Sequence, residues 1–203
     1  MDTVLLDAVG KMKPLITFIG ADEFCEEYFH EFEFRFSRLT DFRVVFIDPR
    51  ESIEDAHLTL LQNSDIVYLS GGNTFELMHH LRRHQLMPLL KKLGQEGKHM
   101  AGHSAGAIAF TPNIRMASVP DFDRDENLVQ LADWRALRLV GLEFFPHYRN
   151  NRKYSEALSE LSKLTQYPIF AVSDGAGFMK DANQTRLFGR VWLFNQGTKV
   201  RIN

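Results

Sequence analysis

Strand-like apolar runs alternate with amphipathic stretches through the first half of the chain, and this alternation limits the fold more than any other feature. Residues 15–19, 42–47 and 65–69 are short runs rich in β-branched and aromatic residues, as in buried strands. Residues 22–39 place apolar side chains three and four positions apart, which predicts a helix, and residues 51–63 suit a shorter one. Strands that alternate with helices form a mostly parallel, doubly wound sheet with helices on both faces.

The alternation continues up to a serine in the middle of the chain. Helices are predicted over residues 74–83 and 88–96, with Pro88 in the first turn of the second helix. A weaker strand, residues 98–102, then leads into Ser104. The N-terminal residues 1–14 contain Asp7, Gly10 and two lysines, so any strand there is short or degenerate.

The pattern changes beyond residue 110, where short strands dominate. A strand over residues 137–145 and a helix over 153–164 are expected first. Closely spaced strands follow, with turns between them that suggest C-terminal β-hairpins at the sheet edge or a small extra sheet. These strands are predicted at residues 169–174, 177–180, 185–189, 191–195 and 198–202.

Size and charge fit a single globular domain over residues 1–203. The net charge is −2, so bulk charge gives no reason to expect nucleic acid or an anionic membrane as partner. No apolar run is long enough to span a bilayer, and the N-terminus lacks the basic start of a signal peptide. Cys25 is the only cysteine, which excludes an intrachain disulfide. We therefore expect a cytoplasmic protein, and a homodimer is compatible with the sequence.

The stretch GHSAGAIAF, residues 102–110, places a serine between small residues at a predicted strand-to-helix junction. A sharp turn there requires small neighbours, and Gly102, Ala105 and Gly106 meet that requirement. Ser104 would stand at the apex as a nucleophile, with the Ala105 N–H directed at the developing oxyanion. The same pattern also arises at strand–helix junctions that carry no chemistry.

The stretch SGGNTFEL, residues 70–77, follows another strand and opens the next helix at the same sheet edge. Gly71 and Gly72 would let the backbone approach a ligand, so Gly72 is a candidate second oxyanion donor. Asn73 or Thr74 can cap the helix, and Asn73 is also a candidate substrate contact. Neither of the common phosphate-binding glycine loops occurs in the chain.

A serine hydroxyl needs a base, and only one histidine follows Ser104 in the chain. His147 lies at the end of an apolar run, after Pro146. Asp174 ends the strand at residues 169–174 and is the best candidate to orient the imidazole. Each residue also has a simpler explanation, as a loop histidine and an ordinary turn aspartate.

No metal or organic cofactor is expected. His80 and His84 are four residues apart, the spacing of a helical metal pair. Arg82 and Arg83 lie beside them and no third ligand is apparent, so a solvated helix face is the expected role. The aromatic run at residues 27–36 has helical spacing, which predicts core packing with Cys25 buried in the same stripe.

The motifs GGNTF at 71–75, G-x-SAGA at 102–107 and PH at 146–147 together resemble peptidase E and its relatives, a serine peptidase family that also contains the cyanophycinases. The resemblance extends over about residues 15–180. It implies a class I glutamine amidotransferase-like, flavodoxin-like α/β fold. It also implies a triad of Ser104, His147 and Asp174.

The resemblance implies further site residues. Gly72 and Ala105 match the backbone donors of the oxyanion hole. Arg152 is nearest to the arginine that holds an acidic substrate side chain in the family, and Arg149 lies close by. Asp121 is the nearest acid to an aspartate that follows the elbow in peptidase E.

These observations predict a serine hydrolase that cleaves a peptide bond in a dipeptide or short peptide through an acyl-enzyme. The acidic composition of residues 111–136 is typical of a solvated loop, and as a lid this loop would exclude long chains. Two alternatives remain open at this point. One is an esterase or other acyl hydrolase with the same triad, and the other is a non-catalytic binding module on the same scaffold.

Overall fold

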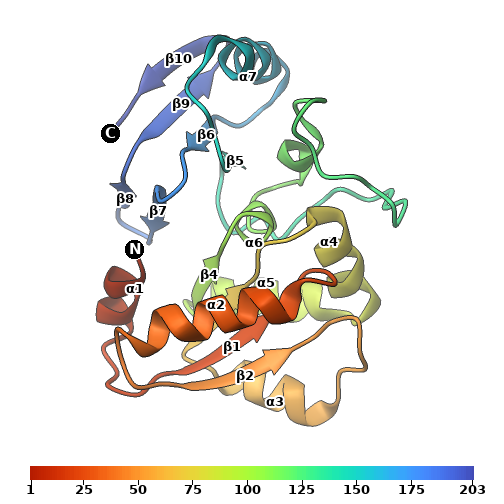
Figure 1. The fold of residues 1–203 in the computed structure, drawn as a ribbon, viewed down its shortest axis with the longest axis vertical. Helices are drawn as coiled ribbons and strands as arrows, with labels where there is room; N and C mark the ends of the chain where they lie inside the picture. Colours follow the sequence, from red (N-terminus) through yellow and green to blue (C-terminus); the bar gives the residue numbers. More distant parts are fainter.

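A four-stranded parallel sheet forms the first half of the protein in the computed structural model, which describes all residues from 1 to 203 (Figure 1). The strand order is β2-β1-β3-β4, and every neighbouring pair is parallel. The strands are β1 (Leu15–Ile19), β2 (Arg43–Ile47), β3 (Ile66–Leu69) and β4 (His99–Gly102). This arrangement confirms the predicted α/β fold class with a parallel core.

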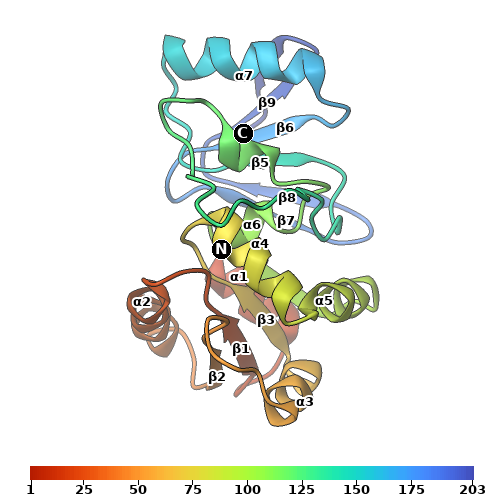
Figure 2. The same ribbon diagram turned by 90° about the vertical axis from the view of Figure 1, so that its right-hand side faces the viewer.

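Helices cover both faces of this sheet, as the alternation predicts. Ile16 and Phe18 of β1 face the core that includes α2, whereas Ile19 faces the core that includes α4 and α5. Successive side chains of a strand point to opposite faces, so one buried strand serves two helical layers. Figure 2 shows α2 on the opposite side of β1 from α3 and α5. The helices are α1 (Asp2–Val9), α2 (Cys25–Ser37), α3 (Asp55–Asn63), α4 (Thr74–Arg83) and α5 (Leu86–Gln95).

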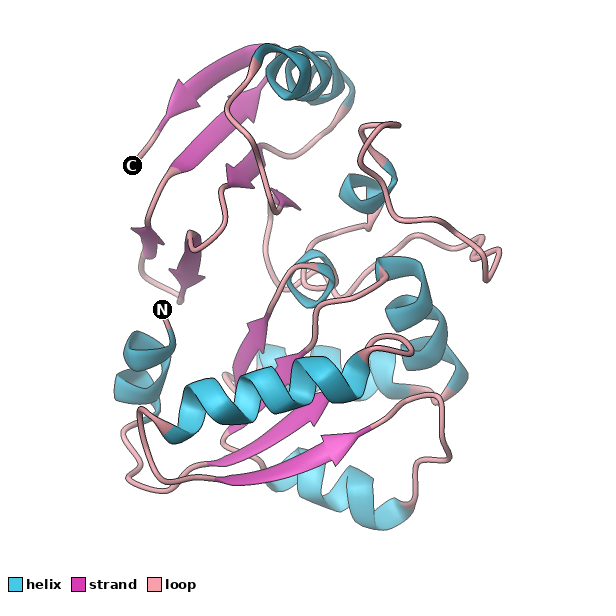
Figure 3. Cartoon of the chain, viewed as in Figure 1, coloured by secondary structure: helices cyan, strands magenta, loops and turns pink.

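A second sheet, of mixed orientation, forms the other half, with strand order β10-β9-β6-β5 (Figure 3). β5 and β6 are parallel, and the remaining pairs are antiparallel. Helix α7 (Arg152–Leu164) packs on β9 and β10, and β7 pairs with β8 as a separate hairpin. These strands are β5 (Glu143–Phe145), β6 (Ile169–Val172), β7 (Gly177–Lys180), β8 (Thr185–Phe188), β9 (Val191–Asn195) and β10 (Thr198–Arg201). The C-terminal hairpins are therefore confirmed.

Two expectations about local structure are wrong. The N-terminus forms helix α1 rather than a degenerate strand, because its leucines and valine pack beside the aromatic core of α2. The strand predicted over 137–145 is limited to β5, and Leu137–Val140 instead bond their backbone to Thr111 and its neighbours. No pairing joins β4 to β5, so the later strands form an extra sheet, which is one of the two arrangements that the sequence left open.

The aromatic run of α2 packs largely as predicted. Phe32 and Phe36 are buried against Phe18 and Tyr68, whereas Phe34 lies on the outer face and is 67% exposed. Such stacked and edge-on aromatic contacts add to the energy of burial. The run is therefore a core element and not a stacking surface.

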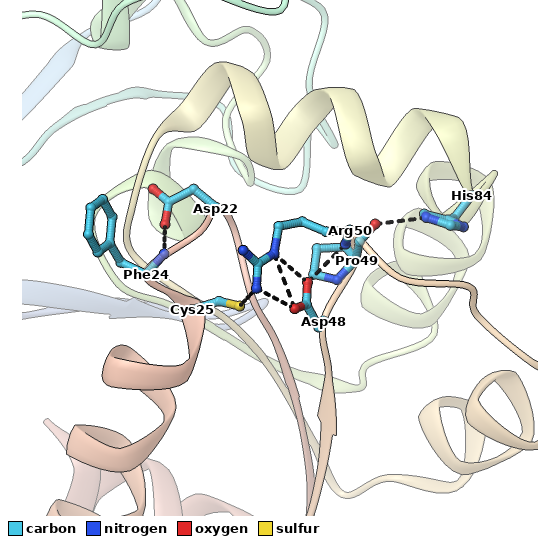
Figure 4. Close-up of polar contacts among 7 residues, drawn as sticks. All are labelled: Asp22, Phe24, Cys25, Asp48, Pro49, Arg50 and His84. Atoms are coloured by element: carbon cyan, nitrogen blue, oxygen red, sulfur yellow. Dashed lines mark hydrogen bonds and ion pairs between the residues drawn. The ribbon is translucent and has the colours of Figure 1, made fainter.

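A polar cluster joins the start of α2, the segment after β2 and the end of α4 (Figure 4). Arg50 pairs with Asp48 at 2.6 Å and donates to the Cys25 sulfur at 3.7 Å. Burial raises the pKa of the Cys25 thiol to about 11, so the thiol stays protonated and unreactive at neutral pH. His84 contacts the Pro49 carbonyl through Nε2, so the expected solvated face is wrong at this position.

None of the helices is long and apolar enough to cross a membrane. The longest, α2 and α7, have 13 residues each, compared with the roughly 20 needed to span a bilayer.

A tight strand–turn–helix unit joins β4 to the short helix α6 (Ala105–Ile108). A Cβ on Gly106 would collide with the Leu69 carbonyl, and one on Gly102 would lie 2.5 Å from the Gly106 backbone. Ser104, between them, has φ 49° and ψ −110°. Residues with a Cβ rarely adopt such a backbone conformation, so the turn stores strain at the serine.

We expect Ser104→Gly to be more stable than Ser104→Ala, because glycine adopts a positive φ without steric cost. Both variants lose the hydroxyl, so the comparison isolates the Cβ. The strain relief of about 1–3 kcal/mol is partly offset by the greater unfolded-state entropy of glycine. A net gain of about 1 kcal/mol would raise the melting temperature by about 2–4 °C. Equal melting temperatures in calorimetry would contradict a strained turn.

The first residue of β5, Glu143, has a buried carboxyl group. Glu143 is 1% exposed and accepts a 2.7 Å hydrogen bond from the Asn113 amide at Oε1, while Oε2 has no partner. Burial raises the pKa of Glu143, although Asn113 and Arg115 oppose the shift. The protonated form is therefore favoured in the folded state.

A raised folded-state pKa means that the stability contributed by Glu143 is complete below its unfolded pKa, about 4.3, and declines as pH rises through the folded pKa. Glu143→Gln has no such proton to lose. We expect the free energy of unfolding of this variant, relative to the parent, to increase between pH 4 and pH 8 in denaturant titrations. A difference that is independent of pH would show that Glu143 is not perturbed.

Candidate active site

Three side chains that are far apart in the sequence meet at one edge of the fold. The Ser104 Oγ lies 2.9 Å from His147 Nε2, and His147 Nδ1 lies 2.6 Å from Asp174 Oδ1. Both distances are within hydrogen-bonding range. The hydroxyl, the imidazole and the carboxylate thus form a continuous hydrogen-bonded chain, in the geometry that activates a serine nucleophile.

Strand ends bring these residues together. His147 follows β5 and Asp174 follows β6, and these two strands are parallel neighbours. The Tyr148 amide donates to the Val172 carbonyl at 2.8 Å, which ties the two loops to each other. Ser104 follows β4, and the His103 amide donates to the Leu69 carbonyl at 3.1 Å. All three side chains therefore emerge at carboxyl ends of parallel strands, where ligands bind in α/β folds.

The chain of three is open to solvent on its carboxylate side. The Asp174 side chain is 83% exposed and that of His147 is 51% exposed. Water competes for an exposed carboxylate, so the Asp174–His147 interaction is weaker than in a buried pair. Asp174 can therefore orient the ring but contributes less to its stabilisation than a buried acid would.

Two backbone amides adjoin the Ser104 turn. Gly72 follows the end of β3, has φ 122°, and its N–H donates to no acceptor in the protein. Ala105 is the first residue of α6, where an amide has no preceding intrahelical acceptor. The Gly106 amide bonds to the Ser70 carbonyl at 2.9 Å, which fixes the serine turn against the loop that carries Gly72.

Asn73 has a structural role at this site. Its Oδ1 accepts hydrogen bonds from the amides of Phe75 and Glu76 and so caps α4, as one of the two expectations proposed. Its Nδ2 donates to the Glu126 carbonyl at 2.9 Å. Both ends of the side chain are therefore engaged by the protein itself.

The charged candidates lie in different settings. Arg152 is 89% exposed and bonds to Glu156 at 2.6 Å on its own helix, and Asp121 is 91% exposed and pairs with Arg124. Arg149, two residues after His147, is exposed and forms no ion pair. Of the two arginines, Arg149 is thus the one free to meet a ligand.

A small cleft of about 20 Å³, next to the turn, was not predicted from the sequence. Its polar lining includes Ser70, Gly71, His103 and Tyr28, and the Ser70 Oγ is buried without a partner. The His103 ring lies edge-on to that of His147, with 6.3 Å between centroids. Partial burial and the neighbouring His147 lower the pKa of His103, which favours the neutral ring. In the sequence, the only indication that His103 belongs to the site is its position directly before Ser104.

The loop over residues 111–136 borders the site. The Asp125 carboxylate accepts from the Thr74 amide at 2.8 Å, and the Asp123 carboxylate accepts from the Tyr154 hydroxyl at 2.5 Å. These bonds fasten the loop to the start of α4 on one side and to α7 on the other. No group of three or more histidine, cysteine, aspartate or glutamate side chains is arranged around a common point.

The sequence is similar to those of several known peptidases. An uncharacterised peptidase of Listeria monocytogenes is 36% identical over 109 residues, which cover 54% of this chain and 51% of that protein. A peptidase E of Shewanella sp. (strain W3-18-1) is 29% identical over 151 residues, covering 70% and 58% respectively. The aligned region thus spans between about half and three fifths of these relatives.

Solved structures share the fold. A Listeria monocytogenes protein described as a candidate peptidase E superposes with a TM-score of 0.71 at 24% identity, covering 92% of each chain. A peptidase from an acI-B1 actinobacterium has a TM-score of 0.64 at 13% identity, covering 100% of this chain and 86% of that one. The sequence model of peptidase family S51 matches residues 1–187. The chain therefore belongs to peptidase family S51.

Proposed function

We propose that the protein is a serine peptidase that hydrolyses a peptide bond in a dipeptide or another short peptide. The observation that carries the proposal is the 2.9 Å contact between Ser104 Oγ and His147 Nε2 at a strained turn. Membership of a peptidase family supports amide hydrolysis over other acyl-transfer chemistry.

In the proposed reaction, Ser104 Oγ attacks the scissile carbonyl while His147 Nε2 takes the hydroxyl proton. Asp174 accepts from Nδ1–H, which holds the ring in the tautomer that leaves Nε2 free to accept. The tetrahedral intermediate collapses as His147 returns the proton to the leaving amine. Water, deprotonated by His147, then attacks the acyl-enzyme, and His147 returns this proton to Ser104 Oγ as the acid product leaves.

The negative oxygen of each tetrahedral intermediate would be held by the amides of Gly72 and Ala105. Both flank the Ser104 turn, and the Gly72 amide has no competing acceptor in the protein. Donors fixed before reaction cost no reorganisation in the transition state, and the loss of one typically slows turnover by about 10²–10³-fold.

The preference for short substrates rests on the loop that borders the site. Asp125 fastens it beside Gly72, and Asp123 fastens it to α7, which follows His147. A loop held at both sides narrows the space available to a long chain. Arg149, exposed, without an ion pair and two residues after His147, is the candidate to meet a substrate carboxylate.

We expect Ser104→Ala and His147→Ala to lower kcat by at least about a thousandfold, because each removes a group that acts in bond making. Asp174→Ala should cost less, about tenfold to a hundredfold, since its carboxylate is 83% exposed. Hydrolysis of a dipeptide panel, with each kcat and KM measured separately, checks this order.

Intact mass after treatment with a serine-directed phosphonate identifies the nucleophile independently of substrate choice. The parent should gain one adduct and Ser104→Ala none. An unlabelled parent would contradict the proposal and favour a non-catalytic binding module. Turnover of p-nitrophenyl esters without turnover of any peptide would favour an esterase instead.

A further inference from the structure

A buried carboxylate contacts the loop that carries Gly72. Asp22, which follows β1, is 6% exposed and accepts a 2.6 Å hydrogen bond from the Asn73 amide at Oδ2. Its Oδ1 accepts from the Phe24 amide at 3.0 Å. A Cβ on Gly72 would collide with this carboxylate, so Asp22 also packs directly against the Gly72 backbone.

A second carboxylate binds the next amide of the same loop. Asp125, from the 111–136 loop, accepts from the Thr74 amide at 2.8 Å. The Asn73 side chain strengthens this connection, because its Nδ2 donates to the Glu126 carbonyl. Consecutive amides, at Asn73 and Thr74, are thus held by acids that come from separate segments of the chain.

These bonds have a directional consequence for Gly72. Hydrogen bonds to ionised acceptors are short and roughly twice as strong as neutral ones, so the peptide planes at Asn73 and Thr74 are firmly fixed. With the amides that follow it bound, the Gly72 amide, like that of Gly71, has no acceptor in the protein. Gly72 has a φ of 122°, and the hydrogen bonds to Asn73 and Thr74 hold the loop in this conformation.

Electrostatics alone would argue against acids in this place. A carboxylate near a developing oxyanion repels it, and a buried carboxylate costs free energy unless hydrogen bonds compensate for its desolvation. The arrangement therefore has a benefit only if the geometry imposed on the loop outweighs the repulsion. An asparagine in place of Asp125, which accepts through Oδ2 alone, would preserve the acceptor while removing the charge. At Asp22 both oxygens accept, so an asparagine would keep only one of the two acceptors.

We propose that Asp22 and Asp125 are positioning residues that clamp the Asn73 and Thr74 amides and thereby aim the Gly72 N–H at the oxyanion formed on Ser104. This inference deepens the proposed function and rests on it for the catalytic consequence. The hydrogen bonds of Asp22 and Asp125 to the loop can be tested separately from their effect on catalysis.

The test compares an alanine and an asparagine variant at each position, Asp22→Ala with Asp22→Asn and Asp125→Ala with Asp125→Asn. An oxyanion donor acts mainly in the transition state, so we expect each alanine variant to lower kcat at least about tenfold with KM changed less than about threefold. Asp125→Asn should recover most of the loss, whereas Asp22→Asn, which keeps one of two acceptors, should recover only part of it. Asp41→Ala, an exposed acid paired with Lys13 far from the site, is the matched control.

The rate of amide hydrogen exchange at Asn73 and Thr74 reports whether these two amides are hydrogen-bonded, and it can be measured without any substrate. The Asp22→Ala variant should speed exchange at Asn73, and Asp125→Ala at Thr74, while Asp41→Ala changes neither. Thermal unfolding of all variants checks that the fold is kept. If Asp22→Ala fails to fold, the Asp125 pair gives the answer alone.

Unchanged exchange in the alanine variants would overturn the clamp. Faster exchange with an unaltered kcat would overturn its catalytic role, as would an Asp125→Asn variant as slow as Asp125→Ala. Failure of the proposed function has a different signature, since the parent would then take no phosphonate label at Ser104. In that case the exchange data still decide whether the acids hold the loop.

Discussion

The contact between Gly106 and the Leu69 carbonyl is the constraint on which the site depends. No side chain fits between them, so α6 begins directly against the end of β3. The chain can leave β4 and enter this helix only by a sharp turn, and Ser104 occupies it with a positive φ. Ser104 consequently lies at the apex of this turn. The amides at the start of α6 lie beside the loop that carries Gly72, since the Gly106 amide donates to the Ser70 carbonyl. The strain at one residue is balanced by packing around it, which is typical of functional turns.

The site also depends on how the two halves of the protein meet. The serine belongs to the parallel half, whereas His147 and Asp174 belong to the mixed sheet. No strand pairing joins β4 to β5, so the alignment of hydroxyl and imidazole relies on loops and on packing around α6. The bond between Tyr148 and Val172 keeps the histidine and the acid together as one unit. Small displacements between the halves would therefore change the Ser104–His147 distance first.

Much of this could be predicted from the sequence, because it depends on local patterns. Buried strands, helical apolar spacing and glycines beside Ser104 indicate the parallel half and its turn. The errors arise where tertiary contacts override local preference. Residues 137–140 have the composition of a strand but bond to residues 109–111, at the end of α6 and just after it. Asp22 carries no motif, since an acid before a helix is ordinary, and only the fold places it beside Gly72. The exposure of Asp174 depends in the same way on packing that no spacing encodes.

A crystal structure of the protein after reaction with a serine-directed phosphonate tests the central claim most directly. The account predicts phosphorus bonded to Ser104 Oγ, with one phosphonyl oxygen about 2.7–3.1 Å from the amide nitrogens of Gly72 and Ala105. His147 should remain within hydrogen-bonding range of the serine oxygen. An adduct on another residue, or a phosphonyl oxygen directed away from both amides into solvent, would contradict it.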